Sequence, residues 1–398
     1  MSQLQISRSP DLSRLRAEGY NVSVEGGHLV MRDVPYVTPN KQIGRCVLAD
    51  AYNDATGQPA SHTMWMSGEK PCDENGQVLM RYLAGDGQLQ NQPIGEHVVA
   101  QWYMSIKMID VGKNHIPDAD YYSKFIRYVD KLGAPVKALG GAETARTYPP
   151  VLPDVEENLV FKYHDTATIR ADIVSISKKL EGQRVAIVGV GGTGSYILDL
   201  VAKTPVAEIH LYDPDTFLQH NAFRAPGAAS IEDLGRKLPK VDYFTEVYGK
   251  MRQGIVPHPA GLTAENAHEL VSMNFVFIAV DPGEHKKLAI VTLQQAGVPF
   301  VDCGMGLYVV DGTIAGQLRL TTVTNSKADH VDRNIKPNQT GVLNEYAHNI
   351  QVAELNAMNA VFAVVRWKKY LGFYNDLEHE HQSLYTVDGN TLLNEECQ

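Results

Sequence analysis

The residues most able to do chemistry lie in a glycine-rich stretch, VAIVGVGGTGSYILDL, at residues 185–200. An apolar run precedes these glycines and a helical pattern follows them, which is typical of a nucleotide-binding turn. Gly189 would permit the tight bend, and Gly194 would let the helix pack close to the strand. Gly191 and Gly192 would let the backbone approach a phosphate, which the free N–H groups of the helix N-terminus attract. The turn fits NAD, FAD, S-adenosylmethionine or ATP.

An acidic residue follows at the position where a ribose would lie. Asp213 closes the next apolar segment, AEIHLYD, about 20 residues after the glycines, where a carboxylate bonds ribose hydroxyls. NAD and ATP both carry a ribose, so Asp213 does not choose between them.

Two cations and a further carboxylate favour a triphosphate. The segments DPDTFLQHNAFRAP, DLGRKLPKV and IAVD follow in this order and carry Arg224, Lys240 and Asp281. The pyrophosphate of a dinucleotide is satisfied by the helix end, whereas cleavage of ATP at its α-phosphorus leaves pyrophosphate that must be neutralised. Arg224 and Lys240 suit that clamp, and Asp281, after an apolar strand, suits Mg²⁺. Taken singly, each is more often a solvated surface charge or a helix cap, but their order together favours ATP.

The elements around these residues predict an α/β domain over residues 160–398. Apolar strands alternate with helices, which indicates a Rossmann-like, mostly parallel sheet with helices on both faces. A long helix over residues 344–371 has a second half that is apolar nearly all round. Such a helix is buried, either in the core or at a subunit interface.

The sequence predicts that residues 1–150 form a separate β-rich α+β domain of unknown role. A connector of glycines, prolines and acidic residues at 140–160 would join it to the α/β domain. A hairpin is expected around Gly26 and Gly27. Apolar residues recur at helical spacing over residues 118–132, which predicts one helix.

Composition excludes several classes of protein. The chain of 398 residues has a formal net charge of −10 and contains no dense run of Lys or Arg. Nucleic-acid binding over a broad surface is therefore not expected. No apolar stretch approaches the roughly 20 residues that span a bilayer, and the N-terminus is too polar for a secretory signal, so a cytoplasmic location is expected. The four cysteines form no C-x-x-C pair, which argues against a disulfide framework or a four-thiolate zinc site. His62 and His97 could pair as metal ligands, although isolated histidines in strands more often pack or face solvent.

Residues 165–372 resemble the ThiF-type, ubiquitin-activating-enzyme-like adenylyltransferases. VAIVGVGGTGS resembles the nucleotide loop of that family, and LYDPDTFLQHNAFR resembles its segment D-x-D-x-(V/I)-(E)-x-S-N-L-N-R-Q. LGRKLPKV resembles the stretch with a phosphate-binding lysine, and VFIAVDPGEHKKLAI resembles the (C/A)-x-D-N segment. The resemblance implies that Asp213 is the ribose ligand and that Asn221 and Arg224 contact the nucleotide. It also implies that Lys240 binds phosphate and that Asp281 is the carboxylate associated with Mg²⁺.

The resemblance implies adenylation of a carboxylate, with ATP and Mg²⁺ as cofactors. In the family the substrate is the C-terminal glycine of a ubiquitin-like protein, and pyrophosphate is released. Capping the carboxylate with AMP supplies a leaving group that a thiol or an amine later displaces. Relatives pair through their sheet domains, which implies a homodimer, and Arg170 resembles an arginine that they lend to the neighbouring subunit.

The chain departs from the family at several positions. Phe223 and Ala225 replace the second asparagine and the glutamine of the strand-two segment. The loop expected to carry a thioester-forming cysteine, residues 321–341, has none. Cys303 is predicted to be a small buried residue, and Cys397 lies at the end of the chain. We therefore expect the enzyme to stop at the adenylate of a ubiquitin-like protein or peptide, or to pass the acyl group to another protein's thiol. An NAD-dependent oxidoreductase and a catalytically degenerate scaffold subunit remain alternatives.

Overall fold

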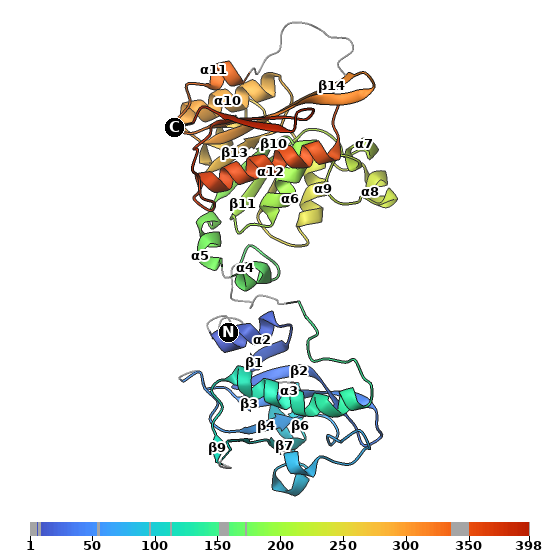
Figure 1. Ribbon diagram of the computed structural model, residues 1–398. Helices are drawn as coiled ribbons and strands as arrows, with labels where there is room; N and C mark the ends of the chain where they lie inside the picture. Colours follow the sequence, from blue (N-terminus) through green and yellow to red (C-terminus); the bar gives the residue numbers. More distant parts are fainter. Residues whose placement is uncertain are drawn as a thin grey trace. The chain divides into compact units, whose positions relative to one another are not determined.

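The computed structural model describes residue 6 and residues 9–53, 56–94, 97–111, 114–150, 159–171, 173–335 and 350–397 (Figure 1). The chain divides into two compact units, Met1–Asn158 and Leu159–Gln398. No helix in these described ranges is long and apolar enough to cross a membrane.

The first unit is built on a five-stranded antiparallel sheet in the order β1-β2-β3-β4-β7. Its strands and main helices are α2 (Pro10–Ala17), β1 (Asn21–Glu25), β2 (His28–Val37), β3 (Ile43–Ala51), β4 (Thr63–Met66), β7 (Trp102–Ser105) and α3 (Tyr121–Ala138). Shorter elements are η1 (Met80–Tyr82), η2 (Gly85–Gly87), β5 (Gln92–Ile94), β6 (Val98–Ala100), β8 (Met108–Ile109) and β9 (His115–Ile116). This confirms the predicted β-rich α+β domain.

Helix α3 shows why the sequence reading of the first unit succeeded. Tyr121, Phe125, Tyr128 and Leu132 are all buried in one core with the sheet, as their helical spacing predicted. The helix begins later than predicted, because Asp120 caps it by accepting a hydrogen bond from the backbone N–H of Ser123 at 2.7 Å. The predicted hairpin is also confirmed, since Gly26 and Gly27 have φ of 52° and 76° between β1 and β2.

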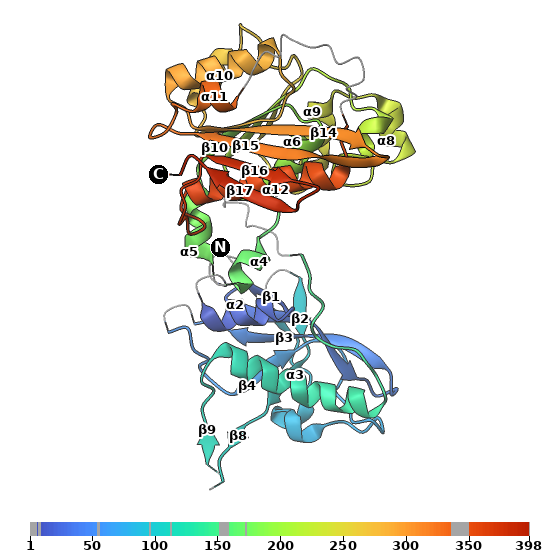
Figure 2. The same cartoon turned by 45° about the horizontal axis from the view of Figure 1, so that its top comes forward.

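The second unit is built on an eight-stranded sheet in the order β12-β11-β10-β13-β14-β15-β16-β17. Its strands are β10 (Arg184–Val188), β11 (Glu208–Tyr212), β12 (Ile255–His258), β13 (Phe275–Ile278), β14 (Phe300–Val310), β15 (Thr313–Val323), β16 (Gln382–Thr386) and β17 (Thr391–Glu395). The first five in spatial order are parallel, and β15, β16 and β17 extend the sheet in antiparallel fashion (Figure 2). The Rossmann-like fold is therefore confirmed, with an antiparallel extension that the sequence reading did not anticipate.

Helices cover both faces of this sheet, as predicted. On one face β10 presents Val185 and Ile187 to α6 (Gly192–Ala202), α9 (Lys240–Tyr248) and α12 (Ala353–Tyr370). On the other face Ala186 and Val188 pack with η4 (Ala267–Ser272), α10 (Glu284–Ala296) and α11 (Val331–Asn334). Because both faces are buried, the strand reads as a continuous apolar run. The remaining helices are α4 (Thr166–Arg170), α5 (Val174–Ser177), η3 (Lys178–Leu180), α7 (Gln219–Ala222) and α8 (Ile231–Arg236).

The late helix differs from its prediction. Helix α12 begins at Ala353 and not at residue 344, and residues 344–349 lie outside the described residues. Within this unit α12 packs only one face on α6 and the sheet, so the core does not bury it all round, and burial at a subunit interface stays a prediction. Trp367 on that face is fully buried, whereas the side chain of Val361 is 44% exposed.

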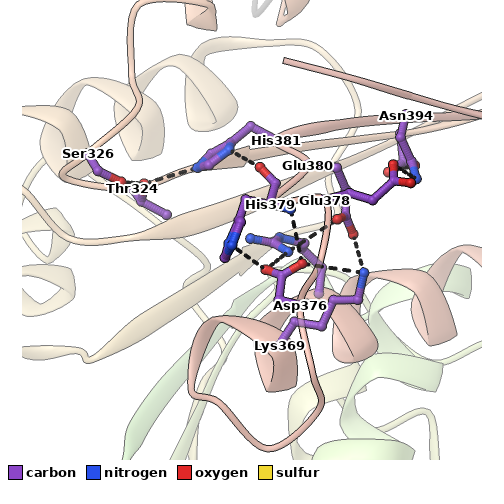
Figure 3. A network of polar contacts seen from close by, with 11 residues as sticks. Thr324, Ser326, Lys369, Asp376, Glu378, His379, Glu380, His381 and Asn394 are labelled. Carbon is purple, nitrogen blue, oxygen red and sulfur yellow. Dashed lines mark hydrogen bonds and ion pairs between the residues drawn. The ribbon is translucent and has the colours of Figure 1, made fainter. Parts of the chain in front are cut away.

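A network of charged side chains fixes the C-terminal end of α12 to the segment before β16 (Figure 3). Arg366 pairs with Asp376 at 2.5 Å and with Glu380 at 3.5 Å, and Lys369 reaches Glu380 at 2.8 Å. Burial opposes ionisation of Asp376, but the hydrogen bond and charge of Arg366 outweigh it, so the pKa of Asp376 lies below its usual value. The network therefore holds α12 at one end while its N-terminal half reaches the site described next.

Candidate nucleotide site

A cavity of about 390 Å³ lies at the carboxyl ends of the parallel strands of the second unit. The chain leaves β10 for β11 on one side and later returns to β13 on the other. Such a switch point between neighbouring strands is where doubly wound sheets bind ligands. Most of the residues predicted for the site line this cavity, namely Gly189, Gly191, Gly192, Asp213, Arg224, Lys240 and Asp281. Gly194 and Asn221 lie outside its lining.

The glycine turn has the geometry that brings a backbone close to a ligand. Gly189 has a φ of 90°, a conformation that favours glycine. A Cβ at Gly194 would lie 1.8 Å from the carbonyl oxygen of Gly189, so the first turn of α6 packs directly on the bend. A Cβ at Gly191 would meet no atom within 4 Å, because Gly191 faces the cavity. The N-terminus of α6 therefore presents its N–H groups to the cavity.

Asp213 holds the glycine turn in place. Its Oδ2 accepts a hydrogen bond from the backbone N–H of Val190 at 2.8 Å, and its Oδ1 accepts one from that of Asp215 at 2.9 Å. Lys240 Nζ lies 3.4 Å from Asp213 Oδ1 and 2.6 Å from Asp215 Oδ2. A carboxylate has about four lone-pair sites, so Asp213 keeps acceptor capacity for a ribose. The bonds to Val190 and Lys240 could not be foreseen from the sequence.

The segment after β11 presents Arg224 to the cavity. Asn221 is 3% exposed, and its Oδ1 accepts from the backbone N–H of Leu218 at 2.8 Å, so it orders this segment around α7. Arg224 lines the cavity, and its Nε is buried without a hydrogen-bond partner among the residues that the structure describes. Of the two departures from the family pattern, Phe223 is 79% exposed and Ala225 is buried in the core.

Asp281 lies three residues after the end of β13, on a segment that a buried lysine supports. Lys286 of α10 donates to the carbonyl oxygen of Val280 at 3.3 Å and pairs with Asp302 Oδ1 at 2.6 Å. Asp302, on β14, is fully buried and also pairs with Arg319 at 2.6 Å. Lys286 thus links the segment that carries Asp281 to β14. The sequence analysis did not predict this link, and the only local signal for it is that a lysine follows Asp281 closely in the sequence. No cluster of three or more His, Cys, Asp or Glu suited to a metal occurs in the part of the chain that the structure describes.

Comparison with known proteins decides the family. The ThiF family matches residues 166–393, which is more than half of the chain. The chain belongs to the ThiF family. Residues 10–166 match a domain of unknown function, DUF6791, and no curated protein matches the chain.

Three solved structures are similar to part of this ThiF-family chain at low sequence identity. E. coli MccB is 19% identical with a TM-score of 0.45, over 57% of this chain and 67% of that chain. E. coli MccB with ATP is 17% identical with a TM-score of 0.44, over 56% and 67%. PaaA is 16% identical with a TM-score of 0.44, over 56% and 75%. The chain thus spans about two thirds of the length of the MccB structures it matches.

A second cavity of about 700 Å³ adjoins the nucleotide cavity in this ThiF-family protein. Both are lined by Cys303, by Met305 and by the segment 280–282. Cys303 is 6% exposed, as predicted, and burial together with the charge of Asp302 raises the pKa of its thiol to about 12. The thiol is therefore protonated at neutral pH.

The remaining candidates from the sequence lie elsewhere. His62 Nε2 is 3.0 Å from Ser105 Oγ in the first unit, and its ring centroid lies 5.0 Å from that of His115. The side chain of Arg170 is outside what the structure describes, as are residues 336–341 of the loop that lacks a cysteine. Cys397 is exposed.

Proposed function

We propose that this protein is an ATP-dependent adenylyltransferase that activates a C-terminal carboxylate of a ubiquitin-like protein or a peptide. One observation carries the proposal. A single cavity gathers the open glycine turn, the carboxylate of Asp213, two cations and a further carboxylate from segments far apart in the sequence. The buried Arg224 Nε has no hydrogen-bond partner among the described residues, so it can bind a phosphate oxygen.

The reaction follows from the placement of these groups. An oxygen of the substrate carboxylate bonds to the α-phosphorus of ATP, the bond from this phosphorus to the bridging oxygen breaks, and pyrophosphate leaves with the electron pair. The N–H groups at the start of α6 would hold the phosphates. Arg224 and Lys240 would neutralise the charge that grows on pyrophosphate.

Magnesium fits the charge balance of the cavity. Its walls carry two cations, Arg224 and Lys240, against three carboxylates, Asp213, Asp215 and Asp281. These walls have no net positive charge for a triphosphate, so a divalent cation would be needed. Asp281 would hold it together with phosphate oxygens, as is usual for Mg²⁺ at nucleotides. Mg²⁺ would supply charge neutralisation at the leaving pyrophosphate.

The acceptor of the activated acyl group would be a separate thiol-bearing protein. Cys303 lines the cavity but is buried, and its raised pKa opposes thiolate formation. We also propose a homodimer, to which the exposed face of α12 with Val361 and Tyr370 would contribute.

Pyrophosphate–ATP exchange with candidate ubiquitin-like tails or peptides tests the proposal on the full chain. ATP with Mg²⁺ should raise the melting temperature and NAD should not, which separates the oxidoreductase alternative. Arg224→Ala should spare AMP binding and weaken ATP binding at least tenfold, because one charge-assisted hydrogen bond contributes about 1.5–3 kcal/mol. Arg236→Ala is the matched control, since Arg236 pairs with Glu246 on the surface at 2.6 Å. Equal loss of AMP and ATP affinity in Arg224→Ala, measured by calorimetry, would contradict the assigned role.

A further inference from the structure

Two asparagines of α12 present unpaired polar atoms to the nucleotide cavity. Asn356 and Asn359 line this cavity and are each 1% exposed. Asn356 Oδ1 accepts from Thr193 Oγ1 at 3.0 Å, and its Nδ2 has no hydrogen-bond partner in the described part of the chain. Asn359 Nδ2 donates to the carbonyl oxygen of Gly304 at 3.1 Å, and no described residue hydrogen-bonds to its Oδ1. Buried polar groups are nearly always hydrogen-bonded, so these two atoms point to a ligand.

The unpaired atoms define the chemistry of that ligand. One is a donor and the other an acceptor, and residues three apart lie on the same face of a helix. A phosphate or a carboxylate offers only acceptors and would leave Asn359 Oδ1 unpaired. An ammonium group offers only donors and would leave Asn356 Nδ2 unpaired. A peptide group offers a C=O and an N–H together, and an adenine edge also offers both.

The position of the asparagines favours the peptide group over adenine. Asp213, the ribose-side carboxylate, follows β11, whereas Asn359 bonds to β14, three strands away in the sheet. Strands lie about 4.8 Å apart, which separates these two sides of the cavity by about 14 Å. A Cβ at Gly192 would lie 2.2 Å from Asn356 Nδ2, so Asn356 packs on the phosphate end of α6. The asparagines therefore face the end where the acyl group joins the α-phosphate.

The second cavity opens on this same side. It shares Cys303 and Met305 with the nucleotide cavity, and it is lined by the glycines Gly304, Gly306 and Gly316 of the β14–β15 hairpin. A Cβ at Gly306 would meet no atom within 4 Å. The space of about 700 Å³ can take the residues that precede a C-terminal carboxylate.

We propose that Asn356 and Asn359 bind the last peptide group of the substrate. Asn356 Nδ2 donates a hydrogen bond to the C=O of that peptide group, and the N–H of the same peptide group donates one to Asn359 Oδ1. This inference rests on the proposed adenylation and names two residues that distinguish its substrates. A free amino acid or a simple carboxylic acid lacks the peptide group that these two asparagines bind.

The test uses two probes that differ in one atom. Acetyl-glycyl-glycine and its ester analogue, with oxygen in place of the last N–H, are titrated into the full chain with AMP present, and binding is followed by NMR. The wild type should bind the amide about tenfold more tightly than the ester, because the ester leaves Asn359 Oδ1 unpaired. Asn359→Leu should abolish this preference. Met358→Leu should keep it, since Met358 lies between the asparagines on α12 but outside the described lining of the cavity.

Several outcomes would overturn the inference. Equal affinity for amide and ester in the wild type, no binding of either probe, or an unchanged preference in Asn359→Leu would each do so. Loss of discrimination between ATP and ITP in Asn359→Leu would show that the asparagines bind the adenine base instead. Thermal unfolding confirms that the variants fold, and Asn359→Ala replaces Asn359→Leu if the latter does not. The proposed adenylation fails by a different result, namely absence of ATP binding or pyrophosphate exchange in the wild type, which leaves the peptide preference measurable.

Discussion

Replacing Gly191 with alanine should weaken nucleotide binding while leaving the second unit folded. Gly191 precedes α6 with a φ of −72°, and an added Cβ meets no protein atom within 4 Å. Alanine caps a helix less well than glycine, which costs about 1 kcal/mol. A unit of this size should then melt about 2–4 °C lower. The methyl group would occupy the space through which a phosphate oxygen reaches the backbone N–H groups.

The expected loss of ATP affinity follows from the hydrogen bonds between the backbone N–H groups and the phosphates. One hydrogen bond to a charged phosphate contributes about 1.5–3 kcal/mol, so losing it should weaken ATP binding about 10- to 150-fold. Isothermal titration calorimetry with ATP and Mg²⁺ measures the affinity, and circular dichroism measures the melting temperature. A folded Gly191→Ala variant that binds ATP like the wild type would refute the placement of the phosphates on this turn.

Gly194→Ala is the matched control because the same methyl group meets backbone there. Its Cβ would lie 1.8 Å from the carbonyl oxygen of Gly189 and 2.8 Å from the carbonyl carbon. Neither atom can move without displacing α6 or the turn, so we expect a loss of about 3 kcal/mol. The melting temperature should fall by roughly 6–12 °C. Unchanged stability of Gly194→Ala would contradict the close packing of α6 on the bend.

Three further predictions follow from the site and its surroundings. Asp281→Asn should keep the fold and slow pyrophosphate exchange about a hundredfold or more, whereas exchange at the wild-type rate would remove Asp281 from the metal site. Cys303→Ala should keep exchange, and no thiol-sensitive adduct should appear on a non-reducing gel; an adduct that the variant loses would make Cys303 a nucleophile. Burial lowers the pKa of His258, His330 and His381, so the unfolded chain takes up these protons more readily than the folded one. The free energy of unfolding in urea should therefore fall below about pH 6.5, by up to about 1.4 kcal/mol per pH unit for each histidine, and a rise on acidification would contradict these shifts.

The sequence determined the fold of the second unit because its signals are local. A strand buried on both faces must be apolar throughout, as β10 is, and a bend with a φ of 90° favours glycine at Gly189. The same holds for α3, whose buried residues repeat at helical spacing. The antiparallel extension escaped prediction at its pairing of β15 with β16. The segment with α11 and α12 lies between these two strands in the sequence, so their pairing leaves no local pattern, whereas β14–β15 and β16–β17 are hairpins.

Which polar side chains meet was decided only by the tertiary structure. The sequence predicts that Asp213 lies where a ribose would bind. It does not predict the hydrogen bond from Val190 N–H to Asp213, because that bond depends on the pairing of β10 with β11. The start of α12 was misplaced because apolar and polar residues continue ahead of Ala353 without a break in periodicity. Asn356 and Asn359 read in the sequence as ordinary polar residues of a helix. The packing of α12 on α6 and β14 buries them and, among the described residues, leaves one donor and one acceptor unpaired at the cavity. Which polar groups are paired depends on which groups become neighbours in space, and the sequence pattern does not show that.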